Sequence, residues 1–294
     1  MSLNQEVDVV RRHIGPTVPK WQLGFLMAGL RRAKGVDQAD VAKHLGVSDS
    51  TIGNQESGKV GMTKSTMTLL LDYYGVRDET ERERYFELQR LSKTRGWWSS
   101  YGKLPAPFTE FLGIESAAEL IDSFELAMVP GLLQTGAYAR AHERAITPTQ
   151  TNEQLERQVE LRLERQNQIL EVDDPPELWV VMDESILHRV TGGPKVMKEQ
   201  LEHIINRVED QKCGLQIVPF TAGDYAGTMG TLSIYTFDGE LHSPIAFVES
   251  QGGTLVMEEP AELGRCSTAY HYIRSTALSP KDSVKMLKER VQSL

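Results

Sequence analysis

The sequence predicts an all-α domain at the N-terminus followed by an α+β domain, and three observations support this fold class. Helical periodicity dominates residues 20–95. Short β-rich runs alternate with helical segments in residues 108–294. Between these regions, glycines, prolines and two tryptophans gather within residues 96–107, a composition that is typical of a domain boundary. We therefore expect domains at 20–95 and 108–294, joined by a linker over 96–107.

In the second domain, four runs rich in β-branched and aromatic residues predict strands at 178–182, 214–220, 231–237 and 245–249. Helices are expected at 151–170, after Gly192-Gly193-Pro194, from Pro260 and from Ser279. Helices that cover one face of a small antiparallel or mixed sheet would be the simplest packing of these elements.

The composition is that of a globular protein. The chain has 294 residues, of which 40% are hydrophobic and 25% are charged, as in ordinary folded domains. No apolar run approaches the roughly 18 residues of a membrane span, and the N-terminus lacks the apolar core of a secretory signal. Cys213 and Cys266 are too few and too far apart for a disulfide framework. These features predict a cytoplasmic protein without membrane contact.

Charge is distributed unevenly along the chain. The formal net charge is −9, yet residues 1–64 carry nine Lys and Arg against six Asp and Glu. A negative total disfavours indiscriminate adhesion to nucleic acid. A mildly basic head on an acidic body therefore indicates that any contact with nucleic acid is confined to the head.

One segment of the head contains most of the functional information. Residues 23–30 place apolar side chains at i, i+3, i+4 and i+7, which predicts an amphipathic helix that ends at Gly35. Asp37 can cap a short second helix, and Gly46 can adopt the left-handed conformation of a tight turn. Ser48 can then cap a third helix. The pattern is a helix, a three-residue turn and a helix, in which we expect the side chains of Val47 and Ile52 to be buried.

Residues 37–59, DQADVAKHLGVSDSTIGNQESGK, carry the spacing of Gln38 and Ala42, the turn at Gly46 and the closing Glu56-Ser57-Gly58. In these features the segment resembles the helix-turn-helix of the lambda-repressor-like XRE family. The resemblance implies an all-α helix-turn-helix domain at 20–95 that binds a double-stranded DNA operator.

The resemblance extends beyond the head. The stretches concerned are WWSSYG at 97–102, VPGLLQTGAYARA at 129–141, GGPKVMKEQL at 192–201, and VPF followed by AGDYAG at 218–227. They resemble the large C-terminal domain of actinobacterial XRE-type regulators. Some of those regulators are grouped as antitoxin-like, with a small partner protein encoded beside them. The resemblance implies no chemistry for the second domain.

A recognition helix lies in the major groove with its N-terminal residues against base edges. By matching positions in the family motif, the residues expected to face DNA are Ser48, Asp49, Ser50, Thr51 and Asn54, with Gln38, Ser57 and Lys59 against the backbone. Asn54 can bond adenine in bidentate fashion, with its amide nitrogen donating and its amide oxygen accepting. Asp49 can accept from cytosine N4, or it can act against wrong sequences.

The third helix departs from the family pattern in two places. Gly53 lies inside the helix, where glycine costs about 0.8–1.0 kcal/mol relative to alanine. Gln55 stands where the family usually has an apolar residue. In addition, no arginine occurs between Ser48 and Gly58, so this helix cannot read guanine through the common arginine contact. Affinity should therefore depend on dimerisation and on backbone contacts.

The same sequence features allow other interpretations. The head could be a plain helical bundle or a protein-docking variant of the fold. Asp183, Glu184 and His188 could suggest catalysis, although Asp183 and Glu184 are better explained as residues that open a helix after a strand. The cysteines and histidines lack metal-ligand spacing. The aromatic and Met side chains of the body could line a ligand pocket, but a domain of this size needs them for its core. We expect no catalytic residues, no metal, no cofactor and no enzymatic activity.

These observations predict a sequence-specific transcriptional regulator that acts as a homodimer on a near-palindromic operator. The resemblance implies a repressor, since repression of nearby genes is the usual consequence in such families. The C-terminal domain is expected to sense a protein partner or a small-molecule effector. The alternative is an antitoxin-like interaction protein that binds and neutralises a small partner protein encoded nearby.

Overall fold

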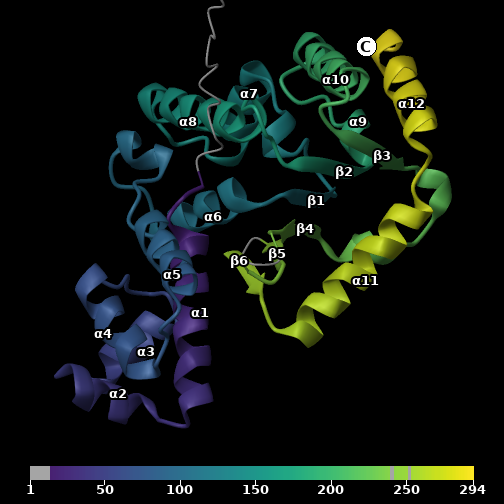
Figure 1. The fold of residues 1–294 in the computed structure, drawn as a ribbon. Coiled ribbons are helices and arrows are strands. Elements are labelled where there is room, and N and C mark those ends of the chain that lie inside the picture. The colour runs from purple at the N-terminus through teal and green to yellow at the C-terminus, as the bar shows by residue number, and fades with distance from the viewer. Residues whose placement is uncertain (1–13, 239–241, 251–252) are drawn as a thin grey trace, which may run out of the picture. The chain divides into compact units, whose positions relative to one another are not determined.

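The computed structural model describes residues 14–238, 242–250 and 253–294. The described chain divides into two compact units, which we call the helical unit and the sheet unit (Figure 1). The helical unit covers residues 14–117, and the sheet unit covers Ala118–Phe237 and Ser243–Leu294. An all-α unit followed by a unit of helices and strands is the fold class that the sequence predicts.

The helical unit is built from amphipathic helices that share one core. Its elements are α1 (Thr17–Lys34), α2 (Gln38–Leu45), α3 (Asp49–Glu56), α4 (Lys64–Tyr74), α5 (Glu79–Leu91), the 3-10 helix η1 (Trp97–Tyr101) and α6 (Ala106–Ala117). Apolar side chains from α1 to α5 meet in the core, among them Leu23, Met27, Val41, Ile52 and Leu71. Burial of these stripes holds the short helices together, because helices of eight residues are not stable alone.

The predicted helix boundaries in this unit are confirmed. Gly35 and Gly46 end α1 and α2 with φ angles of 74° and 68°, a left-handed conformation that glycine adopts without steric cost. Asp37 and Ser48 cap α2 and α3 through their side chains. The expected burial of Val47 is wrong: this side chain is 42% exposed. It lies in the turn, where its backbone N–H bonds the Ala42 carbonyl oxygen at 3.0 Å without the side chain entering the core.

Residues 96–107, which we expected to form a linker, belong to the helical unit, and the sheet unit begins at Ala118. The reason is Trp98, whose side chain is only 7% exposed. A Cβ atom added to Gly15 would lie 2.8 Å from the Trp98 ring, and one added to Gly113 would lie 3.5 Å from it. A large aromatic side chain that packs against these glycines ties η1 and α6 to the start of α1.

The sheet unit contains a mixed six-stranded sheet with the order β3-β2-β1-β4-β5-β6. Its strands are β1 (Leu120–Glu125), β2 (Glu177–Asp183), β3 (Gly214–Val218), β4 (Thr231–Thr236), β5 (Ile245–Ser250) and β6 (Gly253–Met257). The β1–β2 and β2–β3 pairs are parallel, and the remaining pairs are antiparallel. The four predicted strands correspond to β2–β5, whereas the sequence analysis missed β1 and β6.

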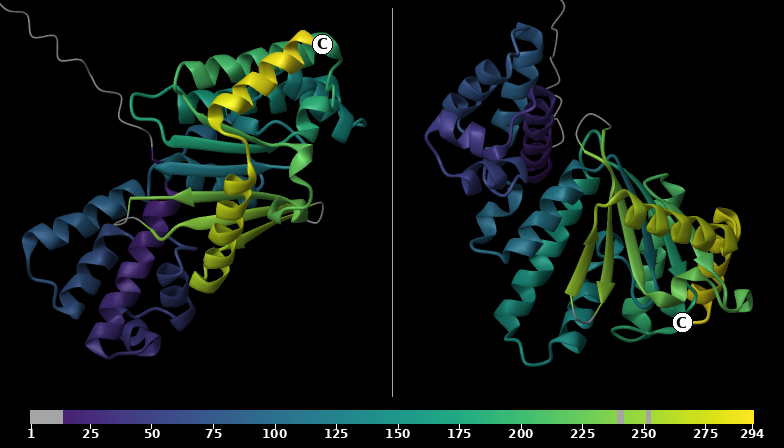
Figure 2. Two further views of the ribbon diagram at one scale, coloured as in Figure 1. Left: turned by 90° about the vertical axis from the view of Figure 1, so that its right-hand side faces the viewer. Right: turned by 90° about the horizontal axis from the view of Figure 1, so that it is seen from below.

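Helices lie on both sides of this sheet, not on one side as expected: α11 covers one face, and α8 and α10 lie on the other side (Figure 2). The helices of the unit are α7 (Gly136–Ile146), α8 (Asn152–Leu170), α9 (Ser185–His188), α10 (Pro194–Glu209), α11 (Pro260–Thr276) and α12 (Pro280–Gln292), with the 3-10 helices η2 (Gly131–Leu133), η3 (Phe220–Ala222) and η4 (Ala226–Met229). Tyr270 and Ile273 of α11 pack with Phe124 and Leu232 of the sheet. The parallel pairs β1–β2 and β2–β3 require crossover connections, which place their helices on one side of the sheet. The chain after β6 then forms α11 on the other side.

Candidate DNA-binding surface

The α2–turn–α3 segment is held by local hydrogen bonds. The Asp40 N–H donates to Asp37 Oδ1 at 2.8 Å, and the Asp37 N–H donates to Asp40 Oδ2 at 3.1 Å. This reciprocal pair satisfies two backbone donors at the start of α2. The turn of residues 46–48 then leads directly into α3. The two helices therefore have the short connection that a helix-turn-helix requires.

The N-terminal end of α3 brings together four of the predicted DNA-facing residues. Ser48 Oγ accepts from the Thr51 N–H at 3.3 Å and lies 2.9 Å from both Ser50 Oγ and Thr51 Oγ1. Asp49 is exposed beside them, as are Ser48 and Ser50, while Thr51 is half-buried. The N-terminal end of α3 thus presents three clustered hydroxyl groups and one carboxylate to solvent.

The remaining predicted residues of this segment lie at the opposite end of α3. The Asn54 carbonyl oxygen accepts from Ser57 Oγ at 3.3 Å and from the Val60 N–H at 3.1 Å. Ser57 is the C-cap of α3, and Lys59 is exposed in the loop that follows. A helix of eight residues is about 12 Å long. Both ends of α3 are therefore close enough to contact one stretch of major groove.

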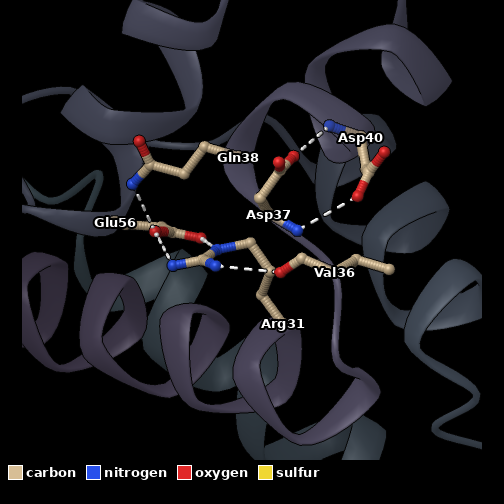
Figure 3. Close-up of polar contacts among 6 residues, drawn as sticks. All are labelled: Arg31, Val36, Asp37, Gln38, Asp40 and Glu56. Atoms are coloured by element: carbon tan, nitrogen blue, oxygen red, sulfur yellow. Dashed lines mark hydrogen bonds and ion pairs between the residues drawn. The ribbon is translucent and has the colours of Figure 1, made fainter.

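The carboxylate of Glu56, a residue of the helix-turn-helix pattern without an assigned role, joins the first three helices (Figure 3). Glu56 Oε1 accepts from Arg31 Nε at 2.7 Å, and Glu56 Oε2 accepts from Arg31 Nη2 at 3.1 Å and from Gln38 Nε2 at 2.8 Å. The side chains of Arg31 and Glu56 are 15% and 7% exposed. Arg31 Nη1 also donates to the Val36 carbonyl oxygen at 3.0 Å. We call Arg31, Gln38 and Glu56 the α1–α3 clamp.

The electrostatics of the clamp keep Arg31 charged. Its hydrogen bonds to Glu56 raise the pKa of the guanidinium, and this effect outweighs burial, which lowers the pKa. Burial, together with the Glu56 carboxylate, raises the pKa of the nearby Tyr74 hydroxyl, which therefore stays neutral. The sequence pattern contains Gln38 and Glu56, but only the fold shows that Glu56 pairs with Arg31, from which 25 residues separate it.

The Gln38 side chain of the clamp lies beside Gly53 of α3. A Cβ atom added to Gly53 would lie 3.4 Å from Gln38 Oε1, so the Gln38 side chain runs close along α3. Its amide nitrogen donates one hydrogen to Glu56 and carries a second hydrogen. The Gln38 amide nitrogen therefore has one donor hydrogen beyond the one that it gives to the clamp.

Helix α1 lies very close to the C-terminal end of α3. A Cβ atom added to Gly24 would lie 2.4 Å from the Glu56 carbonyl oxygen and 2.6 Å from the Gln55 carbonyl oxygen. One added to Gly58 would lie 2.5 Å from Trp21 Cδ1. Gln55 is itself buried, and its Oε1 has no hydrogen-bond partner among the described residues. Helix α3 is thus seated on α1 by backbone contact as well as by the clamp.

Positive charge near α3 comes from neighbouring segments. Lys43 of α2, Lys59 of the α3–α4 loop and Lys64 at the start of α4 are exposed. Thr63 caps α4, with Oγ1 accepting from the Thr66 N–H at 3.0 Å. Lysines and capped helix N-termini of this kind are typical phosphate contacts. The sequence analysis identified Lys59 but neither Lys43 nor Lys64.

Comparison with protein families agrees with this geometry. Residues 22–85 match a family described as a helix-turn-helix domain, which spans most of α1–α5. Residues 108–289 match a family described as a domain of unknown function, DUF5753. The chain belongs to the DUF5753 family. No curated protein and no solved structure was found to match it. The DUF5753 match includes all strands of the sheet unit, and the helix-turn-helix match indicates a DNA-binding regulator.

Within the DUF5753 region, the acidic pair after β2 makes structural hydrogen bonds. Asp183 Oδ1 accepts from the Ser185 N–H at 2.8 Å, and Asp183 Oδ2 accepts from the Tyr225 hydroxyl at 2.6 Å. Glu184 Oε2 accepts from the Phe220 N–H at 2.7 Å, and Glu184 Oε1 lies 3.2 Å from His188 Nε2. These bonds tie the carboxyl ends of β2 and β3 to the segments that follow them.

Among the helices in the described part of the chain, none combines the length and apolar character that crossing a membrane requires.

Proposed function

We propose that this DUF5753 protein is a sequence-specific transcriptional regulator of the cytoplasm that binds its operator as a homodimer, usually to repress. In this proposal α3 enters the major groove. The hydroxyl cluster at its start and Asn54 near its end meet base edges, while Gln38, Ser57 and Lys59 meet the DNA backbone.

The observation that carries the proposal is that α3 exposes polar side chains at one end and is fixed to α1 at the other. Ser48, Asp49 and Ser50 are exposed at its N-terminus. Its other end is held against α1 by Glu56 and by the close approach at Gly24. A recognition helix has to present polar side chains on a rigid support, because misplacement weakens every base contact at once. The helix-turn-helix match supports the same conclusion.

A dimer follows from the weakness of a single head. The third helix contains no arginine, so each half-site is expected to bind modestly. Two heads on one dimer would contact half-sites about 34 Å apart, and the second contact would benefit from a high effective concentration. The sheet unit is the part available for dimerisation and for binding a partner or an effector.

The test is a binding series with the full chain. Fluorescence anisotropy at one salt concentration would compare DNA from upstream of the gene, single-base variants of the bound site and unrelated DNA. Asn54→Ala is expected to cost about 1–3 kcal/mol on the bound site and to relax discrimination at one base position. Asn152→Ala, which removes an amide at the start of α8, is the matched control. Unchanged discrimination in Asn54→Ala would contradict the assignment.

Gln38→Ala separates backbone contact from base reading. It is expected to weaken all DNA sequences by similar factors and to leave the salt dependence nearly unchanged, since no charge is removed. Because Gln38 also bonds Glu56, the free energy of unfolding of this variant has to be measured in parallel. A loss of discrimination at a single base position would place Gln38 against a base instead.

The second candidate is an antitoxin-like interaction protein. The sheet unit exposes large apolar side chains, among them Met229 at 92% and Phe220 at 58%, and such side chains favour contact with another protein. The discriminating measurement is whether a small protein encoded beside the gene binds the full chain and changes its DNA affinity. Binding that leaves DNA affinity unchanged would favour this candidate.

A further inference from the structure

The two edges of the six-stranded sheet differ in how their backbone is covered. At the β3 edge, the Leu278 N–H donates to the Ile217 carbonyl oxygen at 2.8 Å, and the Ile217 N–H donates to Ser283 Oγ at 2.9 Å. The chain between α11 and α12, with the start of α12, therefore shields this edge. At the other edge, β6 pairs with β5 on one side, and within the described ranges no strand pairs with its outer side.

Strand β6 lacks the features that usually protect an open edge. Thr254, Leu255 and Val256 are all exposed, with Leu255 at 58% and Val256 at 47%. Because these two neighbours point to opposite faces of the sheet, both faces of the strand present apolar surface. The strand contains no charged residue and no proline, although natural edge strands commonly carry them to prevent pairing.

The register of the sheet indicates what belongs beside β6. An apolar row crosses the sheet from Val181 through Phe124, Leu232 and Val248 to Leu255, each residue opposite the next on the neighbouring strand. The first three are buried and the fourth is half-buried, whereas Leu255 is exposed. A strand that paired with the outer side of β6 would therefore continue this row if it placed an apolar side chain opposite Leu255.

We propose that β6 pairs antiparallel with β6 of a second copy of this chain, about a two-fold axis at Leu255, so that the two sheets become one. Leu255 of the second copy then continues the apolar row. Thr254 lies opposite Val256 of the other copy, a favourable pairing of β-branched residues. The choice of a second copy as the occupant rests on the proposed function, which needs two heads.

Charge favours a two-fold axis at Leu255 over an axis at the residues that follow β6. Glu258 and Glu259 follow β6 directly. An axis at Glu258 would set two carboxylates opposite each other, which is destabilising. An axis at Leu255 pairs only uncharged residues within the strand. The pairing is also closed, because the described strands of each copy leave one open edge and the two edges pair with each other, so a dimer forms and not a filament.

The first test measures self-association of the full chain without DNA. Sedimentation velocity over a dilution series should give twice the 33.0 kDa mass for the native chain. Leu255→Lys should weaken self-association at least about tenfold, because the pairing would bury an unpaired charge. Ile146→Lys is the matched control, since Ile146 is an equally exposed apolar side chain of the same unit, at 59%. A monomeric native chain, or a Leu255→Lys chain that stays dimeric, would overturn the proposal.

The second test maps the register and does not depend on a destabilising substitution. In a Cys266→Ser background, Leu255→Cys should form a disulfide-linked dimer on mild oxidation, because directly opposite Cα atoms lie about 4.5–5.5 Å apart. Thr254→Cys and Val256→Cys should each fail to cross-link alone and should cross-link when the two proteins are mixed. Cross-linking of Val256→Cys alone, without Leu255→Cys, would reject the axis at Leu255.

The two proposals fail in different measurements. Loss of the dimer in Leu255→Lys together with no DNA binding by the native chain would support the β6 pairing and reject the regulator. If the native chain binds DNA and the Leu255→Lys chain remains dimeric, the β6 pairing is rejected and the regulator is supported.

Discussion

The α1–α3 clamp leads to the sharpest stability prediction, which concerns Glu56→Ala. This substitution removes the acceptor of two hydrogen bonds from Arg31 and one from Gln38. It leaves a guanidinium that is only 15% exposed without its counter-charge. Stability should therefore fall through an unpaired, partly buried charge more than through lost packing.

The size of the effect follows from the burial of the pair. Breaking a buried ion pair by removing one partner costs about 3–5 kcal/mol. Since Arg31 retains some exposure to water, we expect the lower end, about 3 kcal/mol. For a domain of roughly 60–100 residues this corresponds to a fall of about 12–24 °C in the Tm of the helical unit. The double variant Arg31→Met with Glu56→Leu should recover most of the loss, because no charge is left buried.

The assay is thermal unfolding of the full chain, with hydrogen exchange of α1–α3 amides assigning the transition to the helical unit. Glu87→Ala is the control, since Glu87 pairs with Arg90 at the surface of the same unit, where the two side chains are 45% and 71% exposed, and its loss should cost at most about 1 kcal/mol. Equal destabilisation by Glu56→Ala and Glu87→Ala would refute an unpaired buried charge as the cause. That cause would also be refuted if the double variant were as unstable as Glu56→Ala.

Three further predictions concern packing, pH and domain cooperation. Gly24→Ala should destabilise the helical unit by about 1–3 kcal/mol in chemical denaturation, because its Cβ would lie 2.4 Å from a backbone oxygen of α3. Gly29→Ala in the same helix is the control. A Cβ there meets nothing within 4 Å, so this substitution should stabilise the unit by about 0.8–1.0 kcal/mol. Burial, and then the charge of Glu249, raises the pKa of the Glu125 carboxyl from 4.5 to about 8. This carboxyl is then protonated in the folded chain and ionised in the unfolded chain between those values, so the free energy of unfolding should fall as pH rises from 4.5 to about 8. Glu125→Gln should flatten that slope in urea titrations, and an unchanged slope would show that Glu125 does not cause it. Finally, the fragment 1–117 should bind the operator at least about tenfold more weakly than the full chain in anisotropy measurements, whereas equal affinity would show that dimerisation through the sheet unit contributes nothing.

Short-range signals predicted most of the helical unit. Caps and left-handed turn residues act within a few positions of the chain, so Gly35, Asp37, Gly46 and Ser48 mark the ends of the first three helices without knowledge of their neighbours. Four strands of the sheet were also visible as β-rich runs. The exposed polar residues at the start of α3 followed from the same local pattern, while their contacts with DNA stay a prediction.

The elements that the sequence analysis missed depend on distant partners. Strand β1 reads LIDSFE, a polar mixture that is half-buried or buried only because β2 and β4 lie on either side of it. Strand β6 is short and exposed, and its pairing with β5 defines it. Trp98 lies in a run of glycines and prolines typical of a linker, yet its burial against Gly15 and Gly113 makes that run part of the helical unit.

The sequence by itself determined that this chain has a helical head with a helix-turn-helix pattern and a mixed α and β body, because periodicity, caps and turn residues act locally. Only the tertiary structure decided that Glu56 joins Arg31 to Gln38, that Gly24 and Gly58 are sites of close approach, and that no strand of the described residues pairs with the outer side of β6. These features arise from contacts between residues far apart along the chain, which depend on how complete helices and strands pack and which no local pattern encodes.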